Sequence, residues 1–201
     1  GENGYADDES LLETLKPLNL YGASKQWFDL WAKEAGALNE IVGLKYFNVF
    51  GPNEYHKEDM QSMVRKGFLQ VRDAGALKLF KSYKSGYSDG GQERDFLYVR
   101  DAVAMTLFFL EHREIGGIFN VGSGKARNWN DLASAIFQVM NKKADINYIE
   151  MPESIRDQYQ YHTCAKMEKI RSAGYTETIT SLEEGILDYL KNYLIPDKHL
   201  H

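Results

Sequence analysis

The chain has 201 residues, the length of one domain or a little more, and its hydrophobic fraction of 43% is enough to bury a sizeable core. Its net charge of -5 gives no sign of the basic surface that nucleic-acid binding requires. A single cysteine, Cys164, excludes an intramolecular disulfide, and the longest apolar run, over residues 102–110, is too short to span a bilayer. We therefore expect a cytoplasmic protein without nucleic-acid or membrane partners.

Hydrophobic periodicity and turn residues predict strands that alternate with helices along the chain. Residues 1–18 are polar and irregular, and Asn19 is the expected N-cap of the first helix. Helices are expected over residues 20–36, 58–75, 101–112 (with Asp101 as N-cap), 128–142, 165–173 and 181–194. Strands are expected over residues 41–50, 77–80, 94–99, 117–124 and 146–152. This alternation is typical of an α/β architecture with mainly parallel pairing.

Two polar segments lie between these elements. Residues 84–92 are rich in Gly, Ser and Asp with only Tyr87 as an apolar anchor, so we expect a mobile loop. The sequence G-S-G at 122–124 follows a strand, but Arg127 stands where a G-x-G-x-x-G motif needs its third glycine, which indicates a plain turn. No metal site is expected, because the histidines lack ligand spacing with other candidates.

Tyr21 and Lys25 are the first pair that could carry chemistry. They are four residues apart on one predicted helix, so their side chains share a face. A neighbouring ammonium favours the phenolate form of a tyrosine, which can then act as a general base. The pattern Tyr-x-x-x-Lys alone is a common accident on amphipathic helices, so its weight depends on what surrounds it.

Three motifs follow in order: Y-G-A-S-K at 21–25, K-Y-F-N-V-F-G-P at 45–52 and R-D-F-L-Y-V-R-D at 94–101. Together they resemble the extended short-chain dehydrogenase/reductases that act on nucleotide sugars. The resemblance implies that Tyr21 exchanges a proton with a sugar hydroxyl and that Lys25 binds the nicotinamide ribose. It also implies a bound NADP that takes a hydride and returns it.

The same resemblance implies a domain organisation. The fold would be a partial Rossmann-like parallel sheet with an interleaved α/β substrate-binding domain. Residues 1–52 would be a remnant of the NADP-binding domain, and residues 53–201 mainly the substrate-binding domain, with 95–125 returning to the Rossmann sheet. No Gly-rich dinucleotide fingerprint occurs in these residues, and we expect it in a segment that precedes them.

The stretch N-V-F-G-P-N-E-Y-H-K-E-D-M-Q-S-M at 48–63 is similar to the branch of the family that epimerises ADP-heptoses at C6. In that branch a second catalytic lysine, which also contacts the cofactor, follows a histidine, and Lys57 matches it. Asn48 would touch the sugar, and Val49 would line the nicotinamide pocket through its backbone. On the substrate side, the resemblance implies Asp59 and Lys66, which stand where relatives carry Ser and His. It also implies one wall of the nucleotide site, formed by Phe80, Lys81, Ser82 and Tyr83. Arg94 and Tyr159 would hold the ADP portion.

The resemblance implies C6 epimerisation of an ADP-heptose for lipopolysaccharide core synthesis, in a homo-oligomer. One alternative is another nucleotide-sugar 4-epimerase, 4,6-dehydratase or decarboxylase of the same family, although Lys57 argues against these. A second alternative, from a different class, is a non-catalytic nucleotide-binding module, which the missing fingerprint favours for the 201 residues taken alone.

Overall fold

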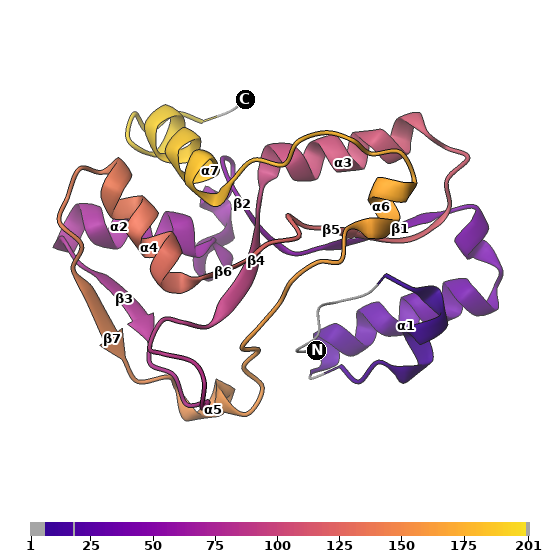
Figure 1. Ribbon diagram of the computed structural model, residues 1–201, viewed down its shortest axis with the longest axis horizontal. Helices are drawn as coiled ribbons and strands as arrows, with labels where there is room; N and C mark the ends of the chain where they lie inside the picture. The colour runs from indigo at the N-terminus through magenta and orange to yellow at the C-terminus, as the bar shows by residue number, and fades with distance from the viewer. Residues whose placement is uncertain (1–6, 18, 200–201) are drawn as a thin grey trace.

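The computed structural model describes residues 7–17 and 19–199, and it confirms the α/β class with mainly parallel pairing (Figure 1). Three parallel strand pairs form its sheets: β1 (Val42–Tyr46) with β5 (Gly117–Val121), β2 (Asn48–Phe50) with β4 (Glu93–Tyr98), and β3 (Leu77–Phe80) with β7 (Ile146–Ile149). The strand β6 (Ala126–Asn128) adds to β4 in the antiparallel direction.

Helices cover these strands. The α-helices are α1 (Leu20–Glu34), α2 (Met63–Ala74), α3 (Val99–Glu111), α4 (Trp129–Val139), α5 (Glu153–Arg156), α6 (Glu168–Ser172) and α7 (Leu182–Tyr189). The 3-10 helices are η1 (Glu9–Thr14), η2 (Ala37–Asn39) and η3 (Tyr55–Met60), and a π-helical turn, η4 (Leu190–Leu194), follows α7. In the described part of the chain, none of these helices has the length and apolar character needed to cross a membrane.

The predicted strand over residues 41–50 is divided in two. The Phe47 amide still donates to the Val121 carbonyl of β5 at 3.0 Å, and after Phe47 the chain leaves β5 and continues as β2 beside β4. The two halves therefore belong to different sheets. This change of partner brings Asn48 and Val49 next to Phe96 and Leu97 of β4.

Two of the predicted helix starts are confirmed by their caps. The Asn19 side chain accepts a hydrogen bond from the Gly22 amide at 2.8 Å and begins α1. Asn128 begins α4 in a reciprocal capping box with Asp131, so that both side chains satisfy backbone amides.

Two other helix starts were predicted wrongly. The helix predicted from residue 58 begins at Met63 with Ser62 as N-cap, because η3 occupies the preceding segment. The helix predicted from Asp101 begins at Val99. The Asp101 carboxylate lies inside its first turn and accepts hydrogen bonds from the Thr180 amide and hydroxyl, both at 3.1 Å.

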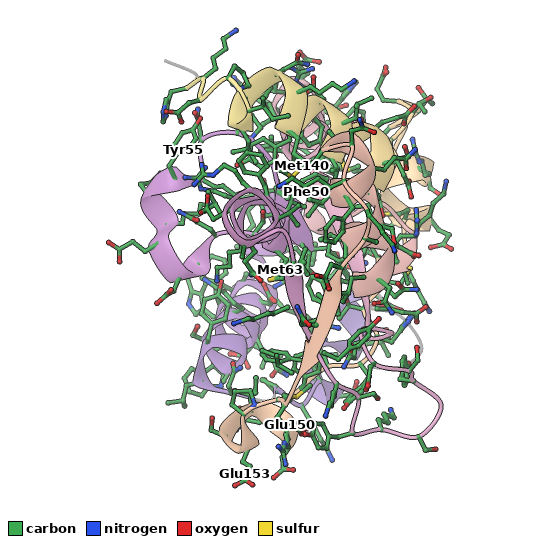
Figure 2. The ribbon with its side chains drawn as sticks, turned by 90° about the vertical axis from the view of Figure 1, so that its left-hand side faces the viewer. Phe50, Tyr55, Met63, Met140, Glu150 and Glu153 are labelled. Atoms are coloured by element: carbon green, nitrogen blue, oxygen red, sulfur yellow. The ribbon has the colours of Figure 1, made fainter. Side chains whose placement is uncertain are left out.

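The core consists of two clusters of buried side chains. One lies among β2, β3, β4, α2, α4 and α7, and includes Phe50, Phe68, Leu77, Ile136 and Tyr189. The other lies among β4, β5, α3 and α6, and includes Leu97, Met105, Phe109, Phe119 and Ile170. In Figure 2 Phe50 and Met140 are labelled in the upper half of the view, and Glu150 and Glu153 near its lower edge.

The loop over residues 84–92, expected to be mobile, has polar anchors that the sequence did not indicate. The Asp89 carboxylate accepts from the Ser82 amide at 2.7 Å, and the Asp89 carbonyl accepts from the Asn130 side chain at 2.9 Å. Gln92 is fully buried. Mobility stays a prediction, and these anchors place it at the tip of the loop, before Asp89.

Candidate active site

Tyr21 and Lys25 lie on one face of α1, as the spacing predicted. The Lys25 ammonium is 4.9 Å from the centre of the Tyr21 ring, and the Tyr21 side chain is exposed. One turn further along α1, the buried Asp29 carboxylate forms an ion pair with Lys45 of β1. The helix that carries the pair is therefore tied to the parallel strands, and its Tyr–Lys face stays available to a ligand.

The residues predicted around the sugar lie after β1. On β2, Asn48 is exposed and Val49 is half-buried. Lys57 is exposed on η3, and in the described chain it makes no hydrogen bond to Tyr21. Lys66 of α2 donates to the backbone carbonyl of Asp59, so these two predicted residues do meet.

Arg94 of β4 and Tyr159 come together in an aromatic cage, which Trp129 and Phe80 complete. The Arg94 guanidinium is nearly buried, 5.0 Å from the Tyr159 ring and 5.7 Å from the Trp129 ring. The Trp129 indole donates to the Tyr159 hydroxyl at 3.2 Å, and Phe80 meets the Tyr159 ring edge to face at 6.4 Å. Burial raises the pKa of Tyr159, which keeps this hydroxyl neutral. A planar cation held between rings suits the recognition of an aromatic, anionic nucleotide.

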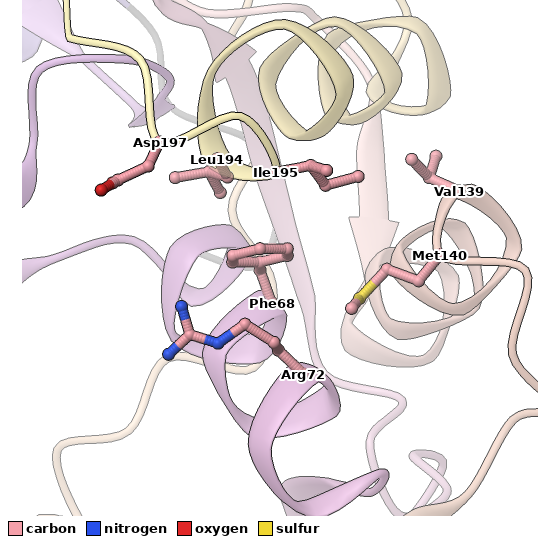
Figure 3. Close-up of a pocket in the computed structure, with 7 residues that line it drawn as sticks. All are labelled: Phe68, Arg72, Val139, Met140, Leu194, Ile195 and Asp197. Carbon is pink, nitrogen blue, oxygen red and sulfur yellow. The ribbon is translucent and has the colours of Figure 1, made fainter.

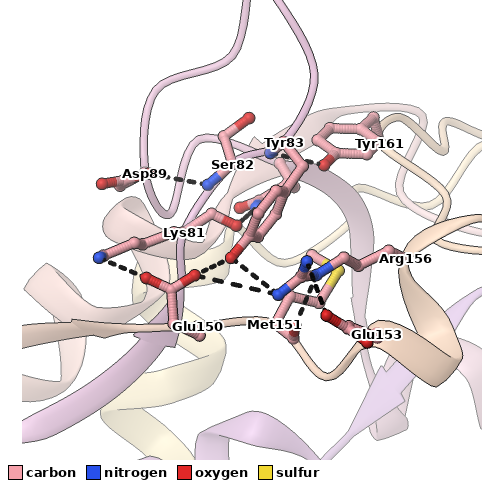
Figure 4. A network of polar contacts seen from close by, with 10 residues as sticks. Lys81, Ser82, Tyr83, Asp89, Glu150, Met151, Glu153, Arg156 and Tyr161 are labelled. Carbon is pink, nitrogen blue, oxygen red and sulfur yellow. Dashed lines mark hydrogen bonds and ion pairs between the residues drawn. The ribbon is translucent and has the colours of Figure 1, made fainter.

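Lys81, Ser82 and Tyr83 continue from β3 into a polar network (Figure 4). Glu150 ties this segment to the end of β7, because its carboxylate forms an ion pair with Lys81 at 2.6 Å and accepts from the Tyr83 hydroxyl. The ion pair raises the pKa of Lys81 and lowers that of Glu150. Arg156 lies over the Tyr83 ring at 4.0 Å and donates to its hydroxyl at 3.1 Å.

Several residues of this region were not predicted. They are Trp129, Tyr161, Glu150 and Arg156. The alternation Tyr159-Gln160-Tyr161 was a usable signal for one of them, because residues two apart on an extended segment face the same side. The Tyr161 hydroxyl accepts from the Tyr83 amide at 2.9 Å, and its ring lies 5.6 Å from Tyr159.

Asp95 explains the turn at residues 122–124. The buried Asp95 carboxylate accepts from the amides of Ser123 at 2.6 Å and Gly124 at 2.9 Å, from the Ser123 hydroxyl at 2.7 Å and from the Ala165 amide at 2.9 Å. Burial raises the pKa of Asp95, and these hydrogen bonds offset part of the rise. The amides that a phosphate would need are used by a carboxylate of the chain itself, which supports the reading as a plain turn. An Arg–Asp neighbour pair usually lies on the surface, but here both residues are buried.

A strained residue lies directly after Lys57. Glu58 has φ 45° and ψ -118°, a conformation that glycine adopts freely and other residues avoid. Strain of this kind costs roughly 1–3 kcal/mol and clusters at functional sites.

We expect Glu58→Gly to stabilise the protein by about 1 kcal/mol, since relief of the strain exceeds the added freedom of glycine in the unfolded chain. Equilibrium unfolding in urea measures the difference. Glu58→Ala is the matched control, because it removes the same carboxylate but keeps Cβ and hence the strain. A Gly variant that is less stable than the Ala variant would show that Glu58 is unstrained, because only the added freedom of glycine in the unfolded chain would then separate the two.

A hollow on the surface lies away from these residues. It has a volume of about 440 Å³ and lies between α2, the end of α4 and the C-terminal turn (Figure 3). None of the predicted site residues lines it; its walls are formed by Phe68, Arg72, Val139, Met140, Leu194, Ile195 and Asp197. Among residues 7–17 and 19–199, no group of three or more His, Cys, Asp or Glu side chains is placed to hold a metal ion.

The parallel strands and the Tyr-x-x-x-Lys helix tied to β1 are features of Rossmann-like proteins of the dehydrogenase type. A family described as NAD dependent epimerase/dehydratase matches residues 1–122, more than half of the chain. An ADP-L-glycero-D-manno-heptose-6-epimerase of Nitratidesulfovibrio vulgaris (Hildenborough) is 49% identical over 201 residues, covering 100% of this chain and 62% of its own length. The chain belongs to the NAD dependent epimerase/dehydratase family.

Solved structures are similar over the same region. The ADP-L-glycero-D-manno-heptose-6-epimerase of Helicobacter pylori superposes with a TM-score of 0.72 at 32% identity, covering 88% of this chain and 52% of that one. A UDP-glucuronic acid 4-epimerase of Bacillus cereus, in complex with UDP-glucuronic acid and NAD, gives a TM-score of 0.71 at 26% identity, covering 96% and 58%. The chain thus spans about 60% of the length of the curated relatives it matches.

Proposed function

We propose that the full-length protein epimerises C6 of ADP-D-glycero-D-manno-heptose to give the L-glycero form. The observation that carries the proposal is the 49% identity to a heptose 6-epimerase along the whole chain. The Lys57 segment and the Arg94 cage supply the two ends of a site for such a substrate, a second base beside the sugar and a cation for the nucleotide. The product would serve lipopolysaccharide core synthesis in the cytoplasm, and we expect a homo-oligomer.

Two bases follow from the geometry of the reaction. Epimerisation removes the proton of one hydroxyl stereoisomer and delivers a proton toward the other. If the hydride donor stays on one side of the sugar, the sugar must turn, and its C6 oxygen then occupies two places. A single base cannot readily reach both. We assign one place to Tyr21, with Lys25 beside its ring, and the other to Lys57 on η3.

The nucleotide end would be held by the aromatic cage. The Arg94 guanidinium presents a planar fork that matches a diphosphate, and the surrounding rings fix its direction. Phe80, Lys81, Ser82 and Tyr83 would form the wall beside it. Val49 and Asn48, adjacent on β2, would face the nicotinamide and the sugar respectively.

A nicotinamide cofactor fits the part of its site that lies in this chain. The Lys25 ammonium stands at the exposed face of α1 beside Tyr21, where it can donate to ribose hydroxyls. When bound, the cofactor supplies the hydride acceptor and donor. We propose NADP as the cofactor, with Lys25, Val49 and Lys57 as its contacts in this chain.

Substrate choice tests the proposed function directly. The full-length protein is incubated with the ADP-heptose and, in parallel, with UDP- and GDP-sugars including UDP-glucuronic acid, and inversion is followed by NMR. We expect turnover of the ADP-heptose alone. Turnover of UDP-glucuronic acid instead would favour a 4-epimerase activity like the one for which the Bacillus cereus protein is named. Parallel titrations with NAD and NADP identify the cofactor.

Arg94→Ala should raise KM roughly 10- to 100-fold with little change in kcat. The diphosphate keeps its charge during the reaction, so a charged hydrogen bond from Arg94 stabilises the ground state and the transition state equally, by about 1.5–3 kcal/mol. Arg94→Lys keeps the charge but loses the planar fork, so most of the effect should persist. The exposed Arg113→Ala is the control. A large loss of kcat at unchanged KM would contradict the binding role.

A further inference from the structure

The two ends of the segment that carries Lys57 are joined by hydrogen bonds to a buried carboxylate. Glu54 follows β2 and is only 5% exposed. Its two oxygens accept from the Ser62 amide at 2.6 Å and the Ser62 hydroxyl at 2.7 Å. Ser62 is also the N-cap of α2, where its hydroxyl accepts from the Arg65 amide at 3.3 Å. Residues 54–62 therefore form a loop that is fixed to the start of a helix.

Further contacts hold the interior of this loop. The Lys57 amide donates to the Glu54 carbonyl at 3.1 Å, and the Gln61 side chain donates to the Tyr55 carbonyl at 2.8 Å. The Tyr55 hydroxyl donates to the Lys198 carbonyl at 3.1 Å. The base of the loop is thus held on both sides, while the Lys57 side chain is exposed.

The surroundings of Glu54 suit a carboxylate that stays in place. Tyr189 lies in the same buried region, and burial together with the Glu54 carboxylate raises the pKa of the Tyr189 phenol. The Tyr189 hydroxyl itself is buried and makes no hydrogen bond among the described residues, so the two bonds from Ser62 set the position of the Glu54 carboxylate.

We propose that Glu54 is the positioning residue for Lys57: by clamping Ser62, it sets where the loop presents the Lys57 ammonium to the sugar. This inference rests on the proposed function. The rival role for Glu54 is purely structural, as a cap that stabilises α2 and the core behind it. The two roles differ in what they do to kcat at a given loss of stability.

The chain offers a matched control in Asp101. It too is buried, and its carboxylate accepts from an amide and a hydroxyl of one residue, Thr180, in the same arrangement as Glu54 with Ser62. Asp101→Ala should lower Tm by a similar amount without a change in kcat, since the residues it ties, in α3 and before α7, bear none of the proposed catalytic groups.

In the full-length protein, Glu54→Ala should lower kcat on the order of 10²-fold with KM changed less than about 2-fold, since small displacements of a reacting group have effects of this size. Glu54→Gln, which keeps the shape and one acceptor, should recover most of the rate. A kcat for Glu54→Ala close to that of the parent protein, or an equal loss in Asp101→Ala at matched Tm, overturns the proposal.

Hydrogen–deuterium exchange separates this inference from the proposed function, because it requires no turnover. Glu54→Ala should speed exchange in residues 55–61 at least 10-fold and leave α1 unchanged. If the parent protein fails to turn over the ADP-heptose, the proposed function fails while the exchange result still stands. Unchanged exchange in residues 55–61 shows that Glu54 does not position the loop.

Discussion

Tyr21→Phe and Lys57→Met should each reduce epimerisation in the full-length protein by about 10²- to 10⁴-fold, the range that positioned acid–base groups contribute. Tyr21→Phe removes the hydroxyl from the ring whose centre lies 4.9 Å from the Lys25 ammonium, and Lys57→Met removes the exposed ammonium of η3. The epimerisation rate of the double variant should be little lower than that of the slower single variant, because one complete inversion needs both bases.

A partial reaction distinguishes two bases from one. Each single variant retains one base, so each should still oxidise one of the two C6 stereoisomers and transfer hydride in a single turnover, and the two variants should prefer opposite stereoisomers. Tyr46→Phe and Lys125→Met, two exposed residues outside the proposed site, are the controls. If Lys57→Met kept a normal kcat and raised only KM, Lys57 would be a binding residue and the two-base mechanism would be untenable.

The features that could be predicted from the sequence are those that short-range geometry determines. Tyr21 and Lys25 share a face because a helix places residues four apart together, and Asn19 caps that helix through its own side chain. The mainly parallel pairing follows from the alternation of strands with helices along the chain.

The features that could not be predicted depend on residues far apart in the chain. Nothing near Arg94 in the sequence indicates that Trp129 and Tyr159 enclose its guanidinium. Nothing near Asp101 indicates that its carboxylate accepts a hydrogen bond from Thr180. The late start of α2 has a different cause. The chain turns at Glu58 with a positive φ, which a glutamate in the sequence does not predict. The helix therefore starts later, with Ser62 as the N-cap of α2.

Asp95→Ala should be the most destabilising single substitution considered, by at least about 3 kcal/mol. Removing the carboxylate leaves the amides of Ser123, Gly124 and Ala165 without their acceptor in a buried place, and each such loss costs roughly 1–3 kcal/mol. Urea unfolding measures the loss, and Asp145→Ala, at an exposed position, should stay within about 0.5 kcal/mol of the parent protein.

Asp95→Asn sharpens the test, because the amide keeps the size of the side chain but presents only one oxygen to donors that now use two. Its stability should lie between those of the parent protein and Asp95→Ala. A loss below about 1 kcal/mol in Asp95→Ala would mean that water replaces the carboxylate as the acceptor for these amides, and that the hydrogen bonds to Asp95 contribute little net stability.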